Sequence, residues 1–203
     1  MSNIVRLKFV TIFLGYVAAM VTGSTAVLAQ ATPTASRSVD FSAFAGLTGT
    51  YTGLSNGRNA GVTAGADLNL PARFGVRPSI EVRATAPFDR GTVDGQKDIL
   101  AGLKGEMSFG RLHPYADFLI GRGEISYVNP YVTYAGTFFY GRSTSTVISP
   151  GLGARFYLGN NFSAFGDVQL QHWDTPVSLS GHLLAKPFTA GLVYRFAYGH
   201  RGR

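Results

Sequence analysis

The chain has 203 residues, with 26 Gly, 15 Phe, 10 Tyr and no Cys. This composition excludes disulfides and favours one domain of strands and turns over several linked modules. Lys and Arg outnumber Asp and Glu by 18 to 11, but the basic residues are scattered and form no block. Nucleic-acid binding is therefore not expected.

The first residues predict export. Arg6 and Lys8 precede an apolar run over residues 9–21, and small residues around Ala29 form a pattern at which signal peptidase cleaves. The run is shorter than the roughly 20 residues of a bilayer-spanning helix, so a retained anchor is the less favoured alternative. We expect cleavage after Ala29 or, alternatively, two residues later.

Beyond Ser38, apolar and polar residues alternate with a period of two, as in strands whose two faces meet different solvents. From Val62 to Leu70, for example, Val, Ala and Leu alternate with Thr, Gly, Asp and Asn. The segments with this pattern are 41–47, 62–70, 76–85, 99–109, 116–121, 148–158, 164–171 and 189–196. No apolar run here reaches the length of a membrane helix. The alternation therefore predicts eight strands.

Short and long connections alternate between these segments, as in membrane barrels with short turns at one end and longer loops at the other. Short turns are expected over 71–74, 110–113 and 159–161, and longer loops over 52–60, 87–98, 127–146 and 174–186. The longest loop carries six aromatic residues between Tyr127 and Tyr140. We interpret them as a membrane-interface girdle, with a recognition surface as the alternative.

The charged residues of the polar parity are balanced, and we expect them to form a network in a narrow lumen. They are Asp67, Arg77, Glu81, Arg83, Lys104, Glu106, Asp117, Arg155, Asp167 and Arg195. Unpaired charges away from water are very costly, so each of these would need a partner. The apolar parity would then face lipid. A soluble lipocalin-like barrel, which is apolar inside, is the alternative.

One ion pair is predicted individually. The turn over 159–161 joins two predicted strands and places residue 155 opposite residue 165 or 167. We therefore expect Arg155 to contact Asp167, and we expect removal of Asp167 to destabilise the protein more than removal of a loop charge such as Asp94.

The segment from Thr189 to Phe196 resembles the C-terminal assembly signal of outer-membrane barrels, with Gly191, Tyr194 and Phe196 at the signal positions. Residues 39–196 as a whole resemble the small outer-membrane barrel family of the OmpA/OmpX type. This resemblance implies an all-β fold, an eight-stranded antiparallel up-and-down transmembrane β-barrel. It also implies recognition by the outer-membrane assembly machinery, although a tail runs past the terminal aromatic residue where many family members stop.

The expected location is the bacterial outer membrane, reached after export through the inner membrane, with outer-membrane lipids as partners and a monomeric state. The expected organisation is a signal peptide (1–29), a short polar segment (30–38), a barrel domain (39–196) and a tail (197–203). The sequence does not identify partners of the external loops.

Few residues are available for catalysis or metal binding, because the chain has no Cys and four His. His113 is expected in a turn, His182 in a loop and His200 in the tail, and none has a second ligand at helical spacing. Neither a metal nor a cofactor is expected. His172 has the lipid-facing parity, and one class of lipid A-modifying enzymes has such a His with a nearby Ser on the same strand. Here Asp174, not Ser, stands two residues after His172.

The sequence thus predicts a non-enzymatic outer-membrane barrel with a side-chain-filled lumen, which contributes to envelope integrity or surface contact. A narrow porin-like channel is the first alternative. A lipid A-modifying enzyme is the second.

Overall fold

The computed structural model describes residues 39–91, 93–132, 139–176, 178 and 180–196. The predicted signal peptide, polar segment and tail, with His200, lie outside the described residues. No helix among the described residues is long and apolar enough to cross a membrane.

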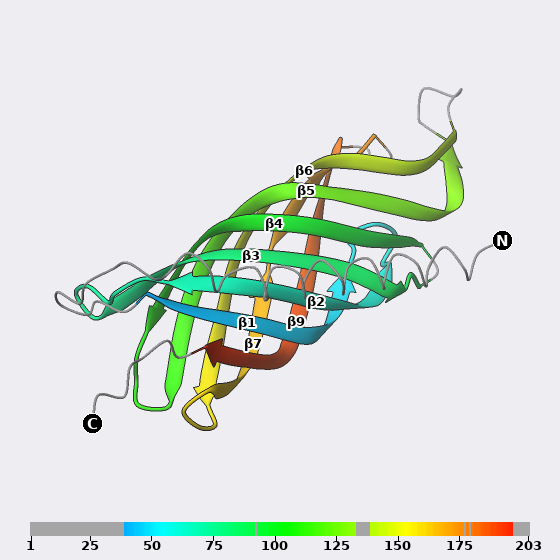
Figure 1. Cartoon of the computed structure of the whole chain (residues 1–203). Helices are drawn as coiled ribbons and strands as arrows, with labels where there is room; N and C mark the ends of the chain where they lie inside the picture. Colours follow the sequence, from blue (N-terminus) through cyan, green and yellow to red (C-terminus); the bar gives the residue numbers. More distant parts are fainter. Residues whose placement is uncertain (1–38, 92, 133–138, 177, 179, 197–203) are drawn as a thin grey trace, which may run out of the picture. The chain divides into compact units, whose positions relative to one another are not determined.

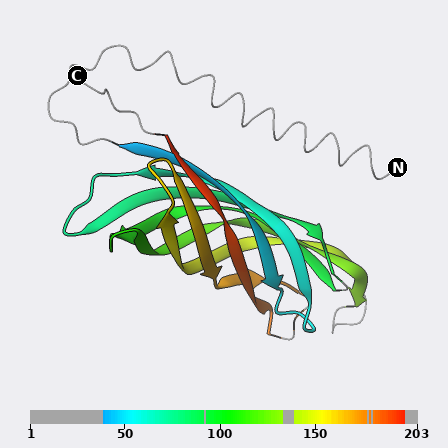
Figure 2. The same ribbon diagram turned by 90° about the horizontal axis from the view of Figure 1, so that it is seen from below.

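The described residues form one antiparallel sheet that closes on itself (Figures 1 and 2). Its strands are β1 (Asp40–Tyr51), β2 (Arg58–Asn69), β3 (Val76–Asp89), β4 (Asp94–Met107), β5 (Leu112–Val132), β6 (Phe139–Tyr157), β7 (Phe162–Gln169), β8 (Gln171–Asp174) and β9 (His182–Phe196). From β1 to β7 each strand pairs with the next, and β1 pairs with β9 from Phe41 opposite Phe196 to Tyr51 opposite Lys186.

Strands β7 and β8 are two halves of one spanning strand. Both pair with β6 on one side and β9 on the other. Between them, the Leu170 N–H donates to the Pro150 carbonyl at 2.9 Å, so the ladder with β6 continues. The described sheet therefore has eight spanning strands, and the predicted eight-stranded antiparallel barrel is confirmed.

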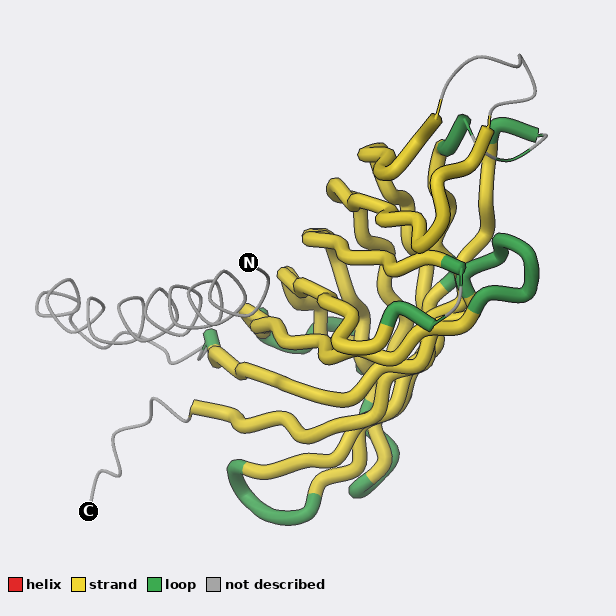
Figure 3. Tube along the Cα trace, turned by 90° about the vertical axis from the view of Figure 1, so that its right-hand side faces the viewer, coloured by secondary structure: helices red, strands yellow, loops and turns green. Residues whose placement is uncertain are grey.

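The connections at one end of the barrel are short turns, as predicted, and those at the other end are shorter than predicted. At the turn end, residues 70–75, 108–111 and 158–161 join the strands, and the barrel also begins and ends there. At the loop end, β4 begins at Asp94 and β9 at His182, so the predicted loops over 87–98 and 174–186 are partly strand. Figure 3 shows strands in yellow over most of the described chain.

The longest predicted loop, over 127–146, is also mostly strand, because β5 runs to Val132 and β6 starts at Phe139. Backbone pairing continues there after the apolar–polar alternation has faded, as where Tyr131 lies opposite Tyr140. Of the six aromatic residues assigned to a girdle, only Tyr127 has a described side chain. It is buried inside the barrel, so the girdle interpretation is wrong for Tyr127.

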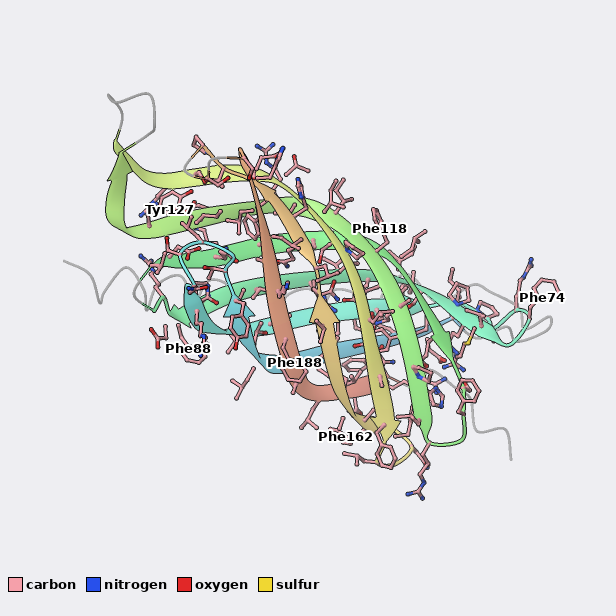
Figure 4. The ribbon with its side chains drawn as sticks, turned by 180° about the vertical axis from the view of Figure 1, so that it is seen from behind. Phe74, Phe88, Phe118, Tyr127, Phe162 and Phe188 are labelled. Atoms are coloured by element: carbon pink, nitrogen blue, oxygen red, sulfur yellow. The ribbon has the colours of Figure 1, made fainter. Side chains whose placement is uncertain are left out.

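The two faces of the strands differ as the alternation predicts. Large apolar side chains are exposed on the outside, for example Leu47, Leu103 and Leu152 at 66–70%. In Figure 4 the labelled Phe118, Phe162 and Phe188 belong to this outer face. The outward face is therefore the apolar one, whereas a lipocalin-like barrel would have its apolar face inside.

The inside has two levels. Towards the loop end lies an apolar cluster made of Leu100, Leu119, Ile125, Tyr127, Val147, Trp173, Leu183 and Ala185. Trp173 is fully buried in it. Towards the turn end the inside is mostly polar, with a smaller apolar group of Phe44, Phe165 and Val193.

Because the sheet closes, we predict that the folded protein resists unfolding in detergent until it is boiled. On gel electrophoresis, boiled and unboiled samples should migrate at different positions. Equal migration of the two samples would contradict a closed barrel.

Candidate functional site

The most distinctive site in the barrel is a set of ion pairs buried in its turn half. Three cations, Arg83 on β3, Lys104 on β4 and Arg155 on β6, contact carboxylates from four strands. All three are almost fully buried. The strands place them there because alternate residues point to the same face.

Lys104 is at the centre of this network. Its Nζ lies 2.5 Å from Asp67 Oδ1 and 2.7 Å from Glu81 Oε2. Both carboxylates have no exposed surface, so the salt bridges compensate for the hydration that these charges lose on burial. Lys104 therefore joins the second and third strands through their acidic residues.

Arg83 carries the network across the barrel. It lies 2.6 Å from Glu81 on its own strand and 2.8 Å from Asp167 on β7. The Tyr115 hydroxyl also donates to Asp167, at 3.2 Å. Strands that are not neighbours in the sheet are thereby connected through the lumen.

Arg155 has partners other than the predicted one. It lies 2.9 Å from Asp67 and 3.3 Å from Glu106, whereas Asp167 forms its salt bridge with Arg83. The register puts Arg155 opposite Phe165 and Asp167 opposite Gly153, which is one of the two registers that the turn allowed. The prediction of an Arg155–Asp167 contact is wrong because nearer acidic partners reach Arg155 from the facing strands.

Aromatic rings fill the space around the cations. The centroid of the Phe44 ring lies 5.6 Å from the Arg83 guanidinium carbon and 5.8 Å from Lys104 Nζ. The centroid of the Tyr115 ring lies 5.2 Å from the same Nζ. A cation over the face of an aromatic ring is attracted by the ring's quadrupole, so these contacts stabilise the buried charges. The hollow that these side chains line has no room for a water molecule.

The structure places the ten predicted lumen charges as follows. Asp67, Glu81, Arg83, Lys104, Glu106, Asp117, Arg155 and Asp167 are buried, whereas Arg77 and Arg195 are half-buried near the turn end. Arg195 contacts Asp40 across the β1–β9 seam. Asp117 accepts a hydrogen bond from the Gln169 amide at 3.1 Å.

The balance of charges differs from the expectation. Among the described residues, the buried carboxylates are Asp40, Asp67, Glu81, Asp94, Asp98, Glu106, Asp117 and Asp167, and the buried cations are Arg83, Lys104 and Arg155. Sequence reasoning missed Asp94 and Asp98 because the region 87–98 was taken for a loop. Asp94 is fully buried, so it is not the loop charge that was expected.

Of the three buried carboxylates that were not predicted, Asp40 contacts Arg195, whereas Asp94 and Asp98 have amide partners. The Gln96 side chain donates to Asp94 at 3.1 Å, and the Gln171 side chain donates to Asp98 at the same distance. Each amide comes from an inward-facing strand position. Polar and apolar residues do not alternate here, because Gly95 and Lys97 separate Asp94, Gln96 and Asp98, so the sequence carries little signal for this part of β4.

The predicted assembly residues lie at the seam where the barrel closes. Gly191 is opposite Gly46, and a Cβ on Gly191 would lie 2.1 Å from the Ala45 carbonyl oxygen. Phe196 packs on Phe41 across the seam with ring centroids 5.4 Å apart. Tyr194 lies edge-on to Phe196, at 4.7 Å.

A second group of polar side chains lies on the outer surface. His172 points outward, as its parity predicts, and its Nε2 lies 3.8 Å from Asp174 Oδ1. His182 is the first residue of β9 rather than part of a loop, and its Nδ1 lies 2.9 Å from the same oxygen.

His113 contacts Glu106 at 2.9 Å and so extends the interior network.

The comparison with solved structures supports this fold. No family model matches the chain, and no curated protein sequence matches it. The crystal structure of Neisserial surface protein A is similar, with 12% sequence identity and a TM-score of 0.50 over 77% of this chain and 96% of that chain. This likeness shows that the chain has the fold of a small outer-membrane β-barrel.

Two further structures are similar at lower scores. Ail, the attachment invasion locus protein of Yersinia pestis, has 12% identity and a TM-score of 0.49 over 77% of this chain and 97% of that chain. OprG of Pseudomonas aeruginosa has 11% identity and a TM-score of 0.47 over 79% of this chain and 97% of that chain.

We predict that Asp167→Ala lowers the free energy of unfolding by about 3 kcal/mol, because Arg83 and Tyr115 lose a buried partner while Arg83 retains Glu81. Denaturant unfolding can be followed by the fluorescence of Trp173, the single Trp of the chain. The control is Asp89→Ala, which removes an exposed carboxylate and should change stability by less than about 0.5 kcal/mol. Equal effects of the two substitutions would show that the network does not depend on Asp167.

We also predict that Phe196→Ala reduces the amount of folded protein in the outer membrane, because it removes an aromatic contact at the closing seam. The measurement is the heat-modifiable fraction in isolated outer membranes. Phe74→Ala, at an exposed aromatic residue of the β2–β3 turn, is the matched control. An unchanged folded amount for Phe196→Ala would place the assembly signal elsewhere.

Proposed function

We propose that this chain is a non-enzymatic integral protein of the bacterial outer membrane that contributes to envelope integrity or surface contact. The observation that carries the proposal is the closed barrel with an apolar outer surface. A soluble monomer rarely exposes a contiguous apolar surface larger than a few hundred Å². Lipid is the solvent in which such a surface is stable, and a closed barrel satisfies its backbone hydrogen bonds there.

The interior supports a role that does not depend on transport. Eight strands enclose a space that side chains can fill. In this barrel the ion pairs around Lys104 occupy the turn half, and the apolar cluster around Trp173 occupies the loop half. An ion crossing the barrel would have to displace side chains at both levels.

The closed seam supports a monomer. β1 and β9 pair with each other, so neither presents a free edge to a second chain. We further propose that the outer-membrane assembly machinery recognises the terminal strand during biogenesis, with Gly191, Tyr194 and Phe196 as the residues involved.

Deletion and complementation test the proposed role. Loss of the gene should increase the sensitivity of cells to detergents and to large antibiotics that an intact outer membrane excludes, and the wild-type gene should restore resistance. Mass spectra of lipid A from the same strains test the enzymatic alternative around His172 and Asp174. A lipid A species that depends on the protein and disappears with His172→Asn would favour the enzyme.

We predict that the purified protein forms no steady channel in planar bilayers. The side chains of Arg83, Lys104, Arg155 and Trp173 occupy the lumen and would block ions. Single-channel recording at several salt concentrations measures this. Large, reproducible conductance steps would contradict the filled lumen and favour the narrow channel.

A further inference from the structure

Three exposed side chains at the loop end of the β8–β9 hairpin have the chemistry of metal ligands. His172 and Asp174 lie two residues apart on the outer face of β8, and His182 lies directly opposite Asp174 on β9. One donor atom from each residue lies within 4.8 Å of the other two. The sequence concealed the group because the hairpin separates the two His.

We propose that His172, Asp174 and His182 bind one divalent transition-metal ion, with Zn²⁺ as its representative. Two imidazole nitrogens and one carboxylate oxygen are a donor set that zinc, nickel and copper accept, whereas calcium and magnesium prefer oxygen alone. A fourth position remains open for water. This site is separate from the buried ion pairs of the lumen.

The distances require only small side-chain movements. Donors around Zn²⁺ lie about 2.0–2.2 Å from the metal and so about 3.3–3.5 Å from one another in a tetrahedron. His182 Nδ1 and His172 Nε2 lie 2.9 and 3.8 Å from Asp174 Oδ1, and all three side chains are about half exposed. All three donor atoms lie within 4.8 Å of one another, so rotation of the exposed side chains would bring them to the spacing that zinc requires.

Several hydrogen bonds and one glycine fix the backbone where His182 begins β9. Gly181 has a φ of 74°, in the left-handed region, immediately before His182. The Ser178 and Ser180 hydroxyls donate to the His182 carbonyl at 2.6 and 3.0 Å. Between the two outward ligands of β8, Trp173 points inward and is fully buried. The strand pair thus holds the ligands on one face before metal arrives, which reduces the ordering cost of binding.

The test uses zinc and the protein purified from outer membranes in detergent without an affinity tag. Calorimetry and competition with a chromophoric chelator should show one Zn²⁺ per chain. Loss of a residue that only hydrogen-bonds to a metal ligand typically weakens metal binding about 10–100-fold. We therefore expect His172→Asn, Asp174→Asn and His182→Asn, which remove direct ligands, each to weaken zinc binding at least about tenfold. His200→Asn is the matched control and should bind as the wild type does.

A second readout follows from linkage, because a ligand that binds only the folded state stabilises that state. Zinc should raise the temperature at which the wild-type barrel unfolds, and it should have no such effect on His182→Asn. Heat-modifiable migration verifies that each variant is folded. Absence of zinc binding to the wild type, or unchanged affinity in all three ligand variants, would overturn the proposal.

Discussion

The structure depends on one constraint, the closure of the sheet through the pairing of β1 with β9. Closure gives every strand two neighbours and divides the side chains into an outward and an inward set, because alternate residues of a strand must point to opposite faces. At the seam between β1 and β9, two positions do not accept a larger residue. Gly46 and Gly191 face each other where a Cβ on either would meet the opposite backbone, so the small residues permit the approach that completes the barrel.

The narrow interior determines how its charges are arranged. A buried charge is stable only with close partners, and the three buried cations Arg83, Lys104 and Arg155 each contact two carboxylates. Carboxylates outside these ion pairs, such as Asp98 and Asp117, have Gln amides as partners. The ion pairs connect strands that are not neighbours in the sheet. We therefore interpret the network as favouring one arrangement of the strands on opposite sides of the lumen over others.

The short strand β8 shows how one segment serves both faces. Gln171 and Trp173 complete the interior, whereas His172 and Asp174 lie on the surface beside His182. Two of the proposed metal ligands therefore project from a strand that the buried Trp173 side chain holds in place. The same side chain helps to fill the lumen. A bound ion would connect the two strands of this hairpin close to its turn.

The sequence by itself determined the strands and their faces, since the period of two is a local property: Leu103 had to face out if Lys104 faced in. It also placed Gly191, Tyr194 and Phe196 in the last strand. Only the tertiary structure decided which charges meet. Asp67 and Arg155 lie far apart in the chain, and their contact depends on how the strands are staggered around the closed barrel. The hairpin register likewise brought His182 to Asp174, and the strands β3 to β6 extended beyond the alternating region because backbone pairing does not require alternating polarity.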